Sequence, residues 1–344
     1  MSRVVRLTQI DGKLPNLALM RLSSWHKRRG DDVVFSRRVT RDMFEPDYDA
    51  VYGSTIFTFS AARTARFKHN FPNAIIGGTG IPAGPLVEAI IGTNDIEYDY
   101  SIYPDYQFSI GFLHRGCRLK CKFCVVPTKE GKPWAEMTVN ELWHGDPYPR
   151  KLHLLDNDFF SLPTWQDRIN EIREGNFKIC LNQGINVRLI NDEAAEALAS
   201  IEYRDDQFQT RRLYTAWDNL KDEKIFFRGI DCLEKHGIPP KNVMAYMLIG
   251  YDPKEDWERI LRRFDLMVDR GVMPYPMVYN NERKDLKAFQ RWAVTGLYRA
   301  VPWKDYRVSQ RRASPSAALQ SDMFVGVSMS RVVRGDKNQQ VGVV

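Results

Sequence analysis

The stretch that decides the fold is residues 108–124, which read FSIGFLHRGCRLKCKFC. Its first part, Phe108–Leu113, is an apolar run typical of a buried strand, and it leads directly into three cysteines. Cys117, Cys121 and Cys124 have the spacing C-x3-C-x2-C and are three of the five cysteines in the chain. Three thiolates at this spacing can hold three irons of a four-iron cluster and leave the fourth iron open to a small molecule, whereas an electron-transfer ferredoxin fills all four positions. The motif therefore favours chemistry at a cluster.

Three other interpretations of these cysteines remain open from the residues alone. On a helix the three positions would share one face and could belong to a core, but the charged residues between them suit a loop better. Structural zinc, with His114 or Cys180 as the fourth ligand, is the second interpretation, although zinc sites usually use C-x2-C pairs. Disulfides are the third. The odd cysteine count and the lack of an N-terminal apolar signal segment instead indicate a reducing, cytoplasmic setting.

The chain beyond the cysteines alternates apolar runs with amphipathic stretches, which is typical of parallel α/β units. Besides Phe108–Leu113, we expect strands at 151–155, 178–181, 212–215, 243–249 and 275–279. The intervening helices are expected near 138–144, 164–174, 191–201, 221–236, 254–270 and 282–298. Six parallel strands with outer helices predict a partial (β/α)6 barrel over residues 108–305.

Gly116–Cys124, with an aromatic residue just before the last cysteine, resembles the signature of the radical S-adenosylmethionine (radical SAM) superfamily. The resemblance implies a partial barrel, a [4Fe-4S] cluster on Cys117, Cys121 and Cys124, and SAM chelated at the open iron. It also implies an external electron donor of the flavodoxin or ferredoxin type. In that family, reductive cleavage of SAM gives a 5′-deoxyadenosyl radical that removes a hydrogen atom from a substrate. Neither the substrate nor a catalytic side chain follows from the motif.

The chemistry of a parallel barrel takes place at the carboxyl ends of its strands, where this sequence has polar or small residues. Such residues also favour turns and helix caps. Together with the resemblance, their positions and charges imply the following contacts with SAM: Asp156 with the ammonium group, Arg188 with the carboxylate, Asn182 and Asp218 with the ribose or the substrate, and Leu248, Gly250 and Phe123 with the adenine. In place of the family's Gly-Gly-Glu-like run, the chain has Asp-Asn-Asp at 156–158.

Residues 1–93 predict a small doubly wound, Rossmann-like domain. Strands are expected at 4–7, 32–35, 50–52 and 74–76, and helices at 14–29 and 60–70. This domain resembles the cobalamin-binding-type domain that precedes the barrel in many radical SAM proteins, including a glycine pair after a late strand. The Asp-x-His-x-x-Gly motif of that family is absent, so we expect no conventional histidine-ligated cobalamin. The run Gly77–Gly80 predicts a tight turn or a phosphate loop, and residues 94–107 predict a linker.

The charge of the chain is distributed unevenly. The net charge of +7 divides into +5 over residues 1–93, −2 over the middle of the chain and +4 over the C-terminal extension 306–344. Basic flanks of this kind suit an anionic partner, so a nucleic acid or a nucleoside-like molecule is one candidate substrate. No segment is long and apolar enough to predict a membrane span. The alternatives to a radical SAM enzyme are a non-enzymatic iron–sulfur redox sensor and a zinc-stabilised nucleic-acid-binding protein.

Overall fold

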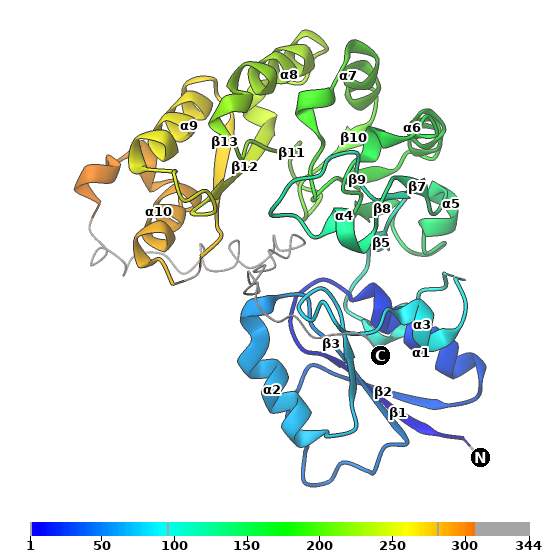
Figure 1. Cartoon of the computed structure of the whole chain (residues 1–344). Helices are drawn as coiled ribbons and strands as arrows, with labels where there is room; N and C mark the ends of the chain where they lie inside the picture. The colour runs from blue at the N-terminus through cyan, green and yellow to red at the C-terminus, as the bar shows by residue number, and fades with distance from the viewer. Residues whose placement is uncertain (1, 95, 281, 307–344) are drawn as a thin grey trace, which may run out of the picture.

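The computed structural model describes residues 2–94, 96–280 and 282–306 of the 344-residue chain. The extension predicted at 306–344 lies outside the described residues, apart from Tyr306. The described chain is an α/β protein built on parallel sheets, in which an N-terminal part lies beneath an arc formed by the rest of the chain (Figure 1). Its helices include none with both the length and the apolar character needed to cross a membrane.

The N-terminal part is a parallel sheet with helices packed against it. Its elements are β1 (Val4–Gln9), α1 (Leu17–Arg28), β2 (Asp32–Ser36), β3 (Ala50–Ser54), α2 (Ala61–Asn70), β4 (Ile75–Gly77) and α3 (Val87–Ile91). The strand order is β2-β1-β3-β4, and the central strand β1 buries Val5 and Leu7 completely. Helix α1 begins after Asn16, whose side chain accepts a hydrogen bond from the Leu19 N–H. Every strand and helix predicted here is confirmed, and the short helix α3 is additional.

The arc contains all six predicted strands, each followed by its predicted helix. They are β5 (Ser109–Gly111), α5 (Val139–Leu142), β8 (Lys151–Leu154), α6 (Trp165–Glu174), β9 (Lys178–Cys180), α7 (Asp192–Ala199), β11 (Leu213–Ala216), α8 (Glu223–Lys235), β12 (Val243–Ile249), α9 (Trp257–Asp269), β13 (Met273–Val278) and α10 (Lys284–Val294). The helices lie on the outside of the arc and the strands on the inside (Figure 1). Parallel α/β architecture is therefore confirmed.

The strands of the arc form two hydrogen-bonded sheets rather than one. The first has the order β10-β9-β8-β5, where β10 (Glu202–Tyr203) is a short strand that the sequence did not predict. The second has the order β11-β12-β13. The two meet through Ile185, whose N–H donates to the Tyr214 carbonyl oxygen at 2.7 Å and whose own carbonyl accepts from Thr215 Oγ1 at 2.9 Å.

The outer helices are held by one apolar face each. Helix α8 buries Phe226, Ile230 and Leu233, which are spaced three or four residues apart and join a large apolar cluster with the strands. Burying one such side chain contributes about 1.5–3 kcal/mol. The helices therefore fix the strands in the arc, and the strand ends can present polar groups without weakening the core.

The predicted linker, of which residue 95 is not described, is a packed part of the structure. Tyr100 and Tyr103 are buried in the apolar core of the N-terminal part, together with Ile110 from β5. The Tyr103 hydroxyl donates to Gln9 Oε1 at 3.0 Å and accepts from the Asn16 N–H at 3.1 Å. These contacts join the linker to the first strand and first helix of the chain, so the connection holds the N-terminal part against the arc.

Candidate functional site

The three motif cysteines lie in a loop between β6 (His114–Arg115) and α4 (Val126–Lys129). Strand β6 pairs antiparallel with β7 (Trp134–Ala135), so the loop and α4 form the tip of a hairpin. All three thiols are free and half-buried. Burial raises the pKa of the Cys117 thiol to about 11 and also raises the pKa of Cys124. Three thiols on one loop are a donor set that fits a metal cluster, whose positive charge would stabilise the thiolates against this burial.

Two carboxylates fix the shape of this loop. Arg118 donates to both oxygens of the buried Asp158 side chain, from Nε and Nη2, each at 2.8 Å. The Glu130 carboxylate accepts from the Gly116 N–H at 3.0 Å and from Asn157 Nδ2 at 3.1 Å. A two-point guanidinium–carboxylate pair is among the stronger hydrogen-bonded contacts in proteins. Because Asn157 and Asp158 follow β8, these bonds anchor the cysteine loop to the carboxyl end of that strand.

Phe123 connects the cysteine loop to the other end of the arc. Its ring meets the Tyr251 ring edge-on with centroids 5.4 Å apart, and Tyr251 meets Tyr279 in the same way at 4.9 Å. These tyrosines follow β12 and β13. Between β12 and Tyr251, Gly250 has a φ of +77°, and a Cβ atom there would lie 2.5 Å from Leu286 Cδ1. Glycine is thus required where the chain leaves β12 and passes the cysteine loop.

Asp218 and Leu248 lie together at the ends of β11 and β12. The Leu248 N–H donates to Asp218 Oδ1 at 2.9 Å, and burial raises the pKa of this carboxyl. The pKa of Cys124, which is raised first by burial, is raised further by the Asp218 carboxylate. Arg263 of α9 is buried and donates to the carbonyl oxygens of Trp217 at 2.8 Å and Leu248 at 2.9 Å. The two strand ends are therefore tied together near the cysteine loop.

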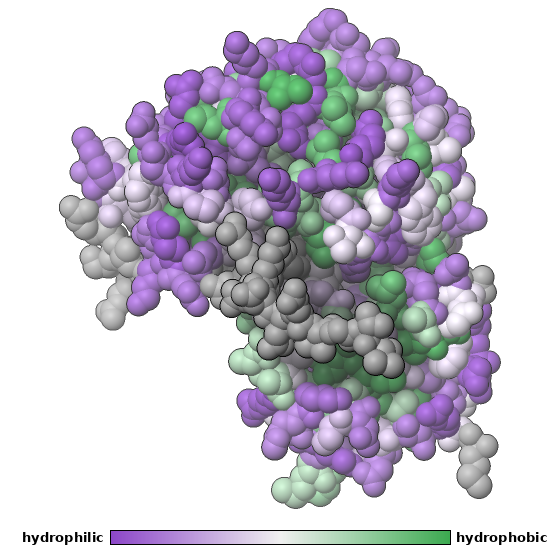
Figure 2. Space-filling view, viewed as in Figure 1, coloured by the Kyte–Doolittle hydropathy of each residue, from purple (hydrophilic) through white to green (hydrophobic). Residues whose placement is uncertain are grey.

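A cavity of about 520 Å³ lies between the N-terminal part and the carboxyl ends of the strands. Val125 and Val126, which follow Cys124 directly, belong to its wall. Most of the lining is apolar, and Figure 2 shows hydrophobic residues gathered where the N-terminal part faces the arc. Uncharged polar side chains occur at separate points of the wall: Asn16, Ser54, Thr79, Asn157, Asn182 and Gln183. The wall also includes six charged residues: Lys13, Arg21, Glu88, Arg115, Lys129 and Glu130. The cavity is therefore a mainly apolar chamber with polar and charged groups, beside the cysteines.

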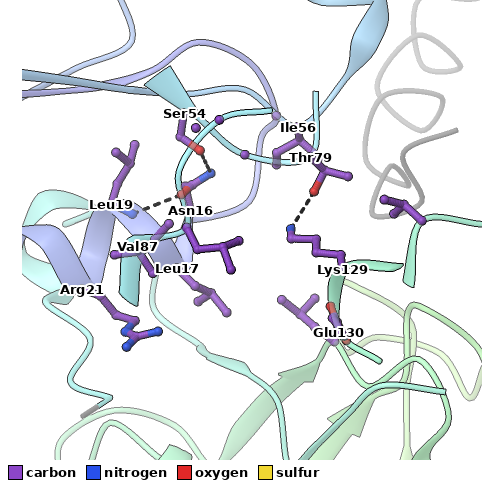
Figure 3. Close-up of a pocket in the computed structure, with 18 of the residues that line it drawn as sticks. Asn16, Leu17, Leu19, Arg21, Ser54, Ile56, Thr79, Val87, Lys129 and Glu130 are labelled. Carbon is purple, nitrogen blue, oxygen red and sulfur yellow. Dashed lines mark hydrogen bonds between the residues drawn. The ribbon is translucent and has the colours of Figure 1, made fainter. Parts of the chain in front are cut away.

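A hydrogen bond joins the two walls of this cavity. Lys129, the last residue of α4, donates from Nζ to Thr79 Oγ1 at 2.8 Å (Figure 3). On the N-terminal wall, Asn16 Nδ2 donates to Ser54 Oγ at 2.8 Å (Figure 3). Thr79 belongs to the run Gly77–Gly80, so the glycine-rich turn of the N-terminal part contacts the helix that follows the cysteines.

The glycines of that run allow two backbone segments to approach closely. Gly78 has a φ of +104°, and a Cβ atom there would lie 2.2 Å from the Thr55 carbonyl oxygen. The same oxygen accepts from the Gly80 N–H at 3.0 Å. These contacts agree with the predicted tight turn, and they use the Gly80 N–H that a phosphate loop would need.

The position of Asp156 in the structure does not match its expected role as a contact for the SAM ammonium group. Its side chain is fully buried, and its two oxygens accept from the N–H groups of Leu113 at 3.1 Å and His114 at 2.6 Å. Asp156 does not line the cavity, whereas the next residue, Asn157, does. With no exposed surface, this carboxylate presents neither oxygen to the cavity. Asp156 therefore positions the strand that leads into the cysteine loop.

Arg188 lies near enough to Asp218 to affect the pKa of that carboxyl, which burial raises and Arg263 and Arg188 lower. The guanidinium of Arg188 pairs with Asp222 at 3.0 Å, and Arg188 is absent from the cavity wall. By contrast, Asn182 lines the cavity, and its carbonyl oxygen accepts from the Tyr246 hydroxyl at 2.8 Å. Of the predicted SAM contacts, Phe123, Asp218, Leu248 and Gly250 gather around the cysteine loop, and Asn182 lies in the cavity.

The loop cysteines are spread more widely than a single zinc site requires. Their sulfur atoms do not all lie within 4.8 Å of one another, a limit that two other groups of side chains in the described chain do meet. One zinc ion holds its sulfur ligands about 3.8 Å apart. The suggested fourth ligands are engaged elsewhere: His114 contacts Thr164 at 3.0 Å, and the Cys180 thiol contacts Asp206 at 3.4 Å.

Sequence reasoning missed the residues that shape the site rather than those at its centre. Asp158 and Glu130 hold the cysteine loop, Arg263 holds the strand ends, and α1 closes the cavity. The sequence contains a signal for the pair of Arg118 with Asp158, because a cation inside the motif is matched by an acid just beyond the neighbouring strand. No protein-family model matches the chain, and a search of curated proteins finds no match.

Proposed function

We propose that the chain is a radical SAM enzyme in which Cys117, Cys121 and Cys124 hold a [4Fe-4S] cluster with one iron open to SAM. One observation carries the proposal: three free, half-buried thiols share a loop that is anchored to the carboxyl ends of parallel strands, beside a cavity of about 520 Å³. When bound, the cluster and SAM supply a 5′-deoxyadenosyl radical that removes a hydrogen atom from the substrate. On this proposal the arc is the partial (β/α)6 barrel of that family.

The chain's own residues orient SAM at the rim of the arc. Phe123 and the backbone at Gly250 flank the adenine, and Asp218 and Asn182 face the ribose. Asn157 replaces Asp156 as the polar contact next to the cysteines, because its side chain lies in the cavity wall. These groups lie on four separate strand ends and on the cysteine loop, so SAM would bridge the elements that Arg118 and Arg263 hold together.

The cavity favours a small and largely apolar substrate over a strand of nucleic acid. Among its charged lining residues, Arg21 pairs with Glu88, and Arg115 lies 3.5 Å from Glu130. A nucleic-acid groove would instead present cations along a backbone path. On this proposal the apolar part of the wall would limit water beside the cysteines and so protect a reactive radical from side reactions.

The outer side of the cysteine loop suits an acidic electron donor. Lys120 and Lys122 alternate with the cysteines and are exposed. Complementary charge steers protein partners together and fixes their orientation. A flavodoxin or ferredoxin with an acidic surface is therefore the proposed partner at this face.

The proposal is tested by anaerobic reconstitution with iron and sulfide, reduction with dithionite, and chromatographic measurement of 5′-deoxyadenosine formed from SAM. We expect the wild-type chain to form it, and a variant with Cys117, Cys121 and Cys124 all changed to alanine to form none. A well-formed cluster that never cleaves SAM, with or without candidate apolar substrates, would favour the redox-sensor alternative. One zinc per chain bound by the loop, with no sulfide, would contradict the proposal.

A further inference from the structure

A second group of metal-ligating side chains lies inside the arc. His153 in β8, Cys180 in β9 and Asp206 after β10 each offer one ligand atom, and these atoms all lie within 4.8 Å of one another. The exposed fractions of the three residues are 2%, 0% and 9%. The rings of Phe108 and Phe208 pack against His153 with centroids 5.6 and 4.9 Å away. A nitrogen, a sulfur and an oxygen donor thus converge in a closed, apolar environment.

The hydrogen bonds of His153 have the pattern of a metal ligand. Its Nε2 lies 2.8 Å from the backbone carbonyl oxygen of Asp206, and because that oxygen can only accept, Nε2 carries the proton. The other nitrogen, Nδ1, therefore carries a lone pair, which accepts a hydrogen bond from the Tyr106 hydroxyl at 2.5 Å. Metal-binding histidines generally donate their second N–H to a carbonyl or carboxylate in this way.

The contacts of Asp206 suit the binding of a cation. Its Oδ1 lies 3.4 Å from Cys180 Sγ, close to the spacing of about 3.6 Å that one tetrahedral zinc imposes on a sulfur and an oxygen ligand. Its Oδ2 is buried and has no hydrogen-bond partner in the described part of the chain. A buried carboxylate oxygen without a partner is uncommon and requires an explanation such as an ion.

We propose that His153, Cys180 and Asp206 bind one zinc-class divalent ion. Thiolate, imidazole and carboxylate together suit zinc, whereas magnesium and calcium prefer oxygen ligands alone. Since all the donors are buried, the ion is structural.

The position of this site explains what the ion would stabilise. The first sheet of the arc ends at β10, and the next strand, β11, belongs to the second sheet. Asp206 lies in the connection between these two strands. An ion bound to β8, β9 and this connection fixes the chain where the ladder of backbone hydrogen bonds is interrupted. This inference does not depend on the proposed radical SAM activity.

The test uses the full-length chain with Cys117, Cys121 and Cys124 changed to alanine, so that no cluster competes for metal. Because the site is closed, the protein is produced in medium containing cobalt(II), a spectroscopic substitute for zinc. Bound metal is measured by mass spectrometry, and thiolate ligation by the near-ultraviolet sulfur-to-cobalt absorption band. We expect about one cobalt per chain and a clear band, with loss of the band on adding Cys180→Ala and loss of most of the metal on adding Asp206→Asn.

Cys232→Ala is the matched control, because Cys232 belongs to the other three-residue group, with Asp192 and His236, on the outer helices. This control should keep both the metal and the band. Circular dichroism checks that each variant is folded, and Asp206→Asn keeps the side-chain volume should Cys180→Ala pack poorly. No bound cobalt, or a band that survives in Cys180→Ala or is lost in Cys232→Ala, would overturn the proposal.

Discussion

The cysteine loop and the buried Cys180 show two opposite ways of holding a thiol. The loop cysteines are half-buried at the tip of a hairpin. The shape of their loop is fixed by ion pairs of neighbouring residues, such as the pair of Arg118 with Asp158. Cys180 lies within a strand, has no exposed surface, and contacts a carboxylate directly. The first arrangement lies beside a cavity, whereas the second is closed on every side. Open metal sites suit chemistry on an incoming molecule and closed sites suit structure, so on the two proposals above cysteine would serve two purposes in one arc.

The largest expected effect comes from removing single cysteines from the loop. Any one of Cys117→Ala, Cys121→Ala and Cys124→Ala should abolish cluster assembly, because each removes one of only three thiolates. Iron and sulfide content after anaerobic reconstitution measures this loss. Cys232→Ala, on the outer helix α8, should bind as much iron as the wild-type chain. Unchanged iron content in all three loop variants would show that the loop thiols do not hold the cluster.

The second effect concerns the charged support of the loop. Asp158→Asn removes the buried carboxylate that grips Arg118 and leaves the guanidinium without its two-point partner. Mutation of a residue that supports metal ligands typically lowers metal affinity about 10–100-fold. Iron should therefore leave the variant correspondingly faster than the wild-type chain in the presence of a chelator. Asp231→Asn, which breaks an exposed pair with Arg270, is the control and should release iron at the wild-type rate. Equal rates in all three proteins would show that the loop needs no such support.

The third effect separates backbone strain from loss of contacts. Gly116 and Gly131 flank the loop and have φ values of +81° and +76°. A Cβ atom at Gly116 would lie 2.5 Å from the Lys132 carbonyl oxygen, whereas a Cβ atom at Gly131 would meet nothing within 4 Å. Gly116→Ala should therefore lower the free energy of unfolding by about 2–4 kcal/mol, and Gly131→Ala by about 1 kcal/mol. Urea denaturation measures both, and similar losses in the two variants would contradict the close contact at Gly116.

The smallest effect is a pH dependence on the strand side of the same hairpin. Burial raises the pKa of Glu136 to about 7, although Arg115 lies 3.3 Å away. The folded chain then holds this proton to a higher pH than the unfolded chain, so the free energy of unfolding should fall as the pH rises from about 4.5 to about 7. Glu136→Gln should remove about 1–2 kcal/mol of this fall. Urea unfolding across that range measures it, and equally steep curves for both proteins would argue against the raised pKa.

Local patterns predicted the strands and helices well, because each element is determined by the spacing of its own apolar residues. The helix with Phe226, Ile230 and Leu233 and the apolar run that became β12 are examples. The break of the arc into two sheets could not be predicted, since it depends on how Ile185 and Tyr214 meet across the fold. The cavity was missed for the same reason.

The candidate site was predicted in part. The cysteines and Gly250 could be proposed because the motif, and a glycine directly after an apolar strand, leave a signal in the sequence; their binding roles stay predictions. The hydrogen-bond partners of Asp156 and Arg188 could not be predicted, because charge and position do not reveal which carboxylate binds the backbone or which guanidinium finds a partner nearby. That information comes only from the bonds of Asp156 to the backbone and of Arg188 to Asp222.

The most direct test of the central claim, that three thiolates leave one iron open to SAM, is electron paramagnetic resonance of the reduced, reconstituted chain with and without SAM. The account predicts the signal of a reduced four-iron cluster. The shape of this signal changes when SAM is added, whereas buffer without SAM leaves it unchanged. A cluster signal that is identical with and without SAM would contradict an open iron. The absence of any cluster signal, with zinc in the loop, would contradict the cluster itself.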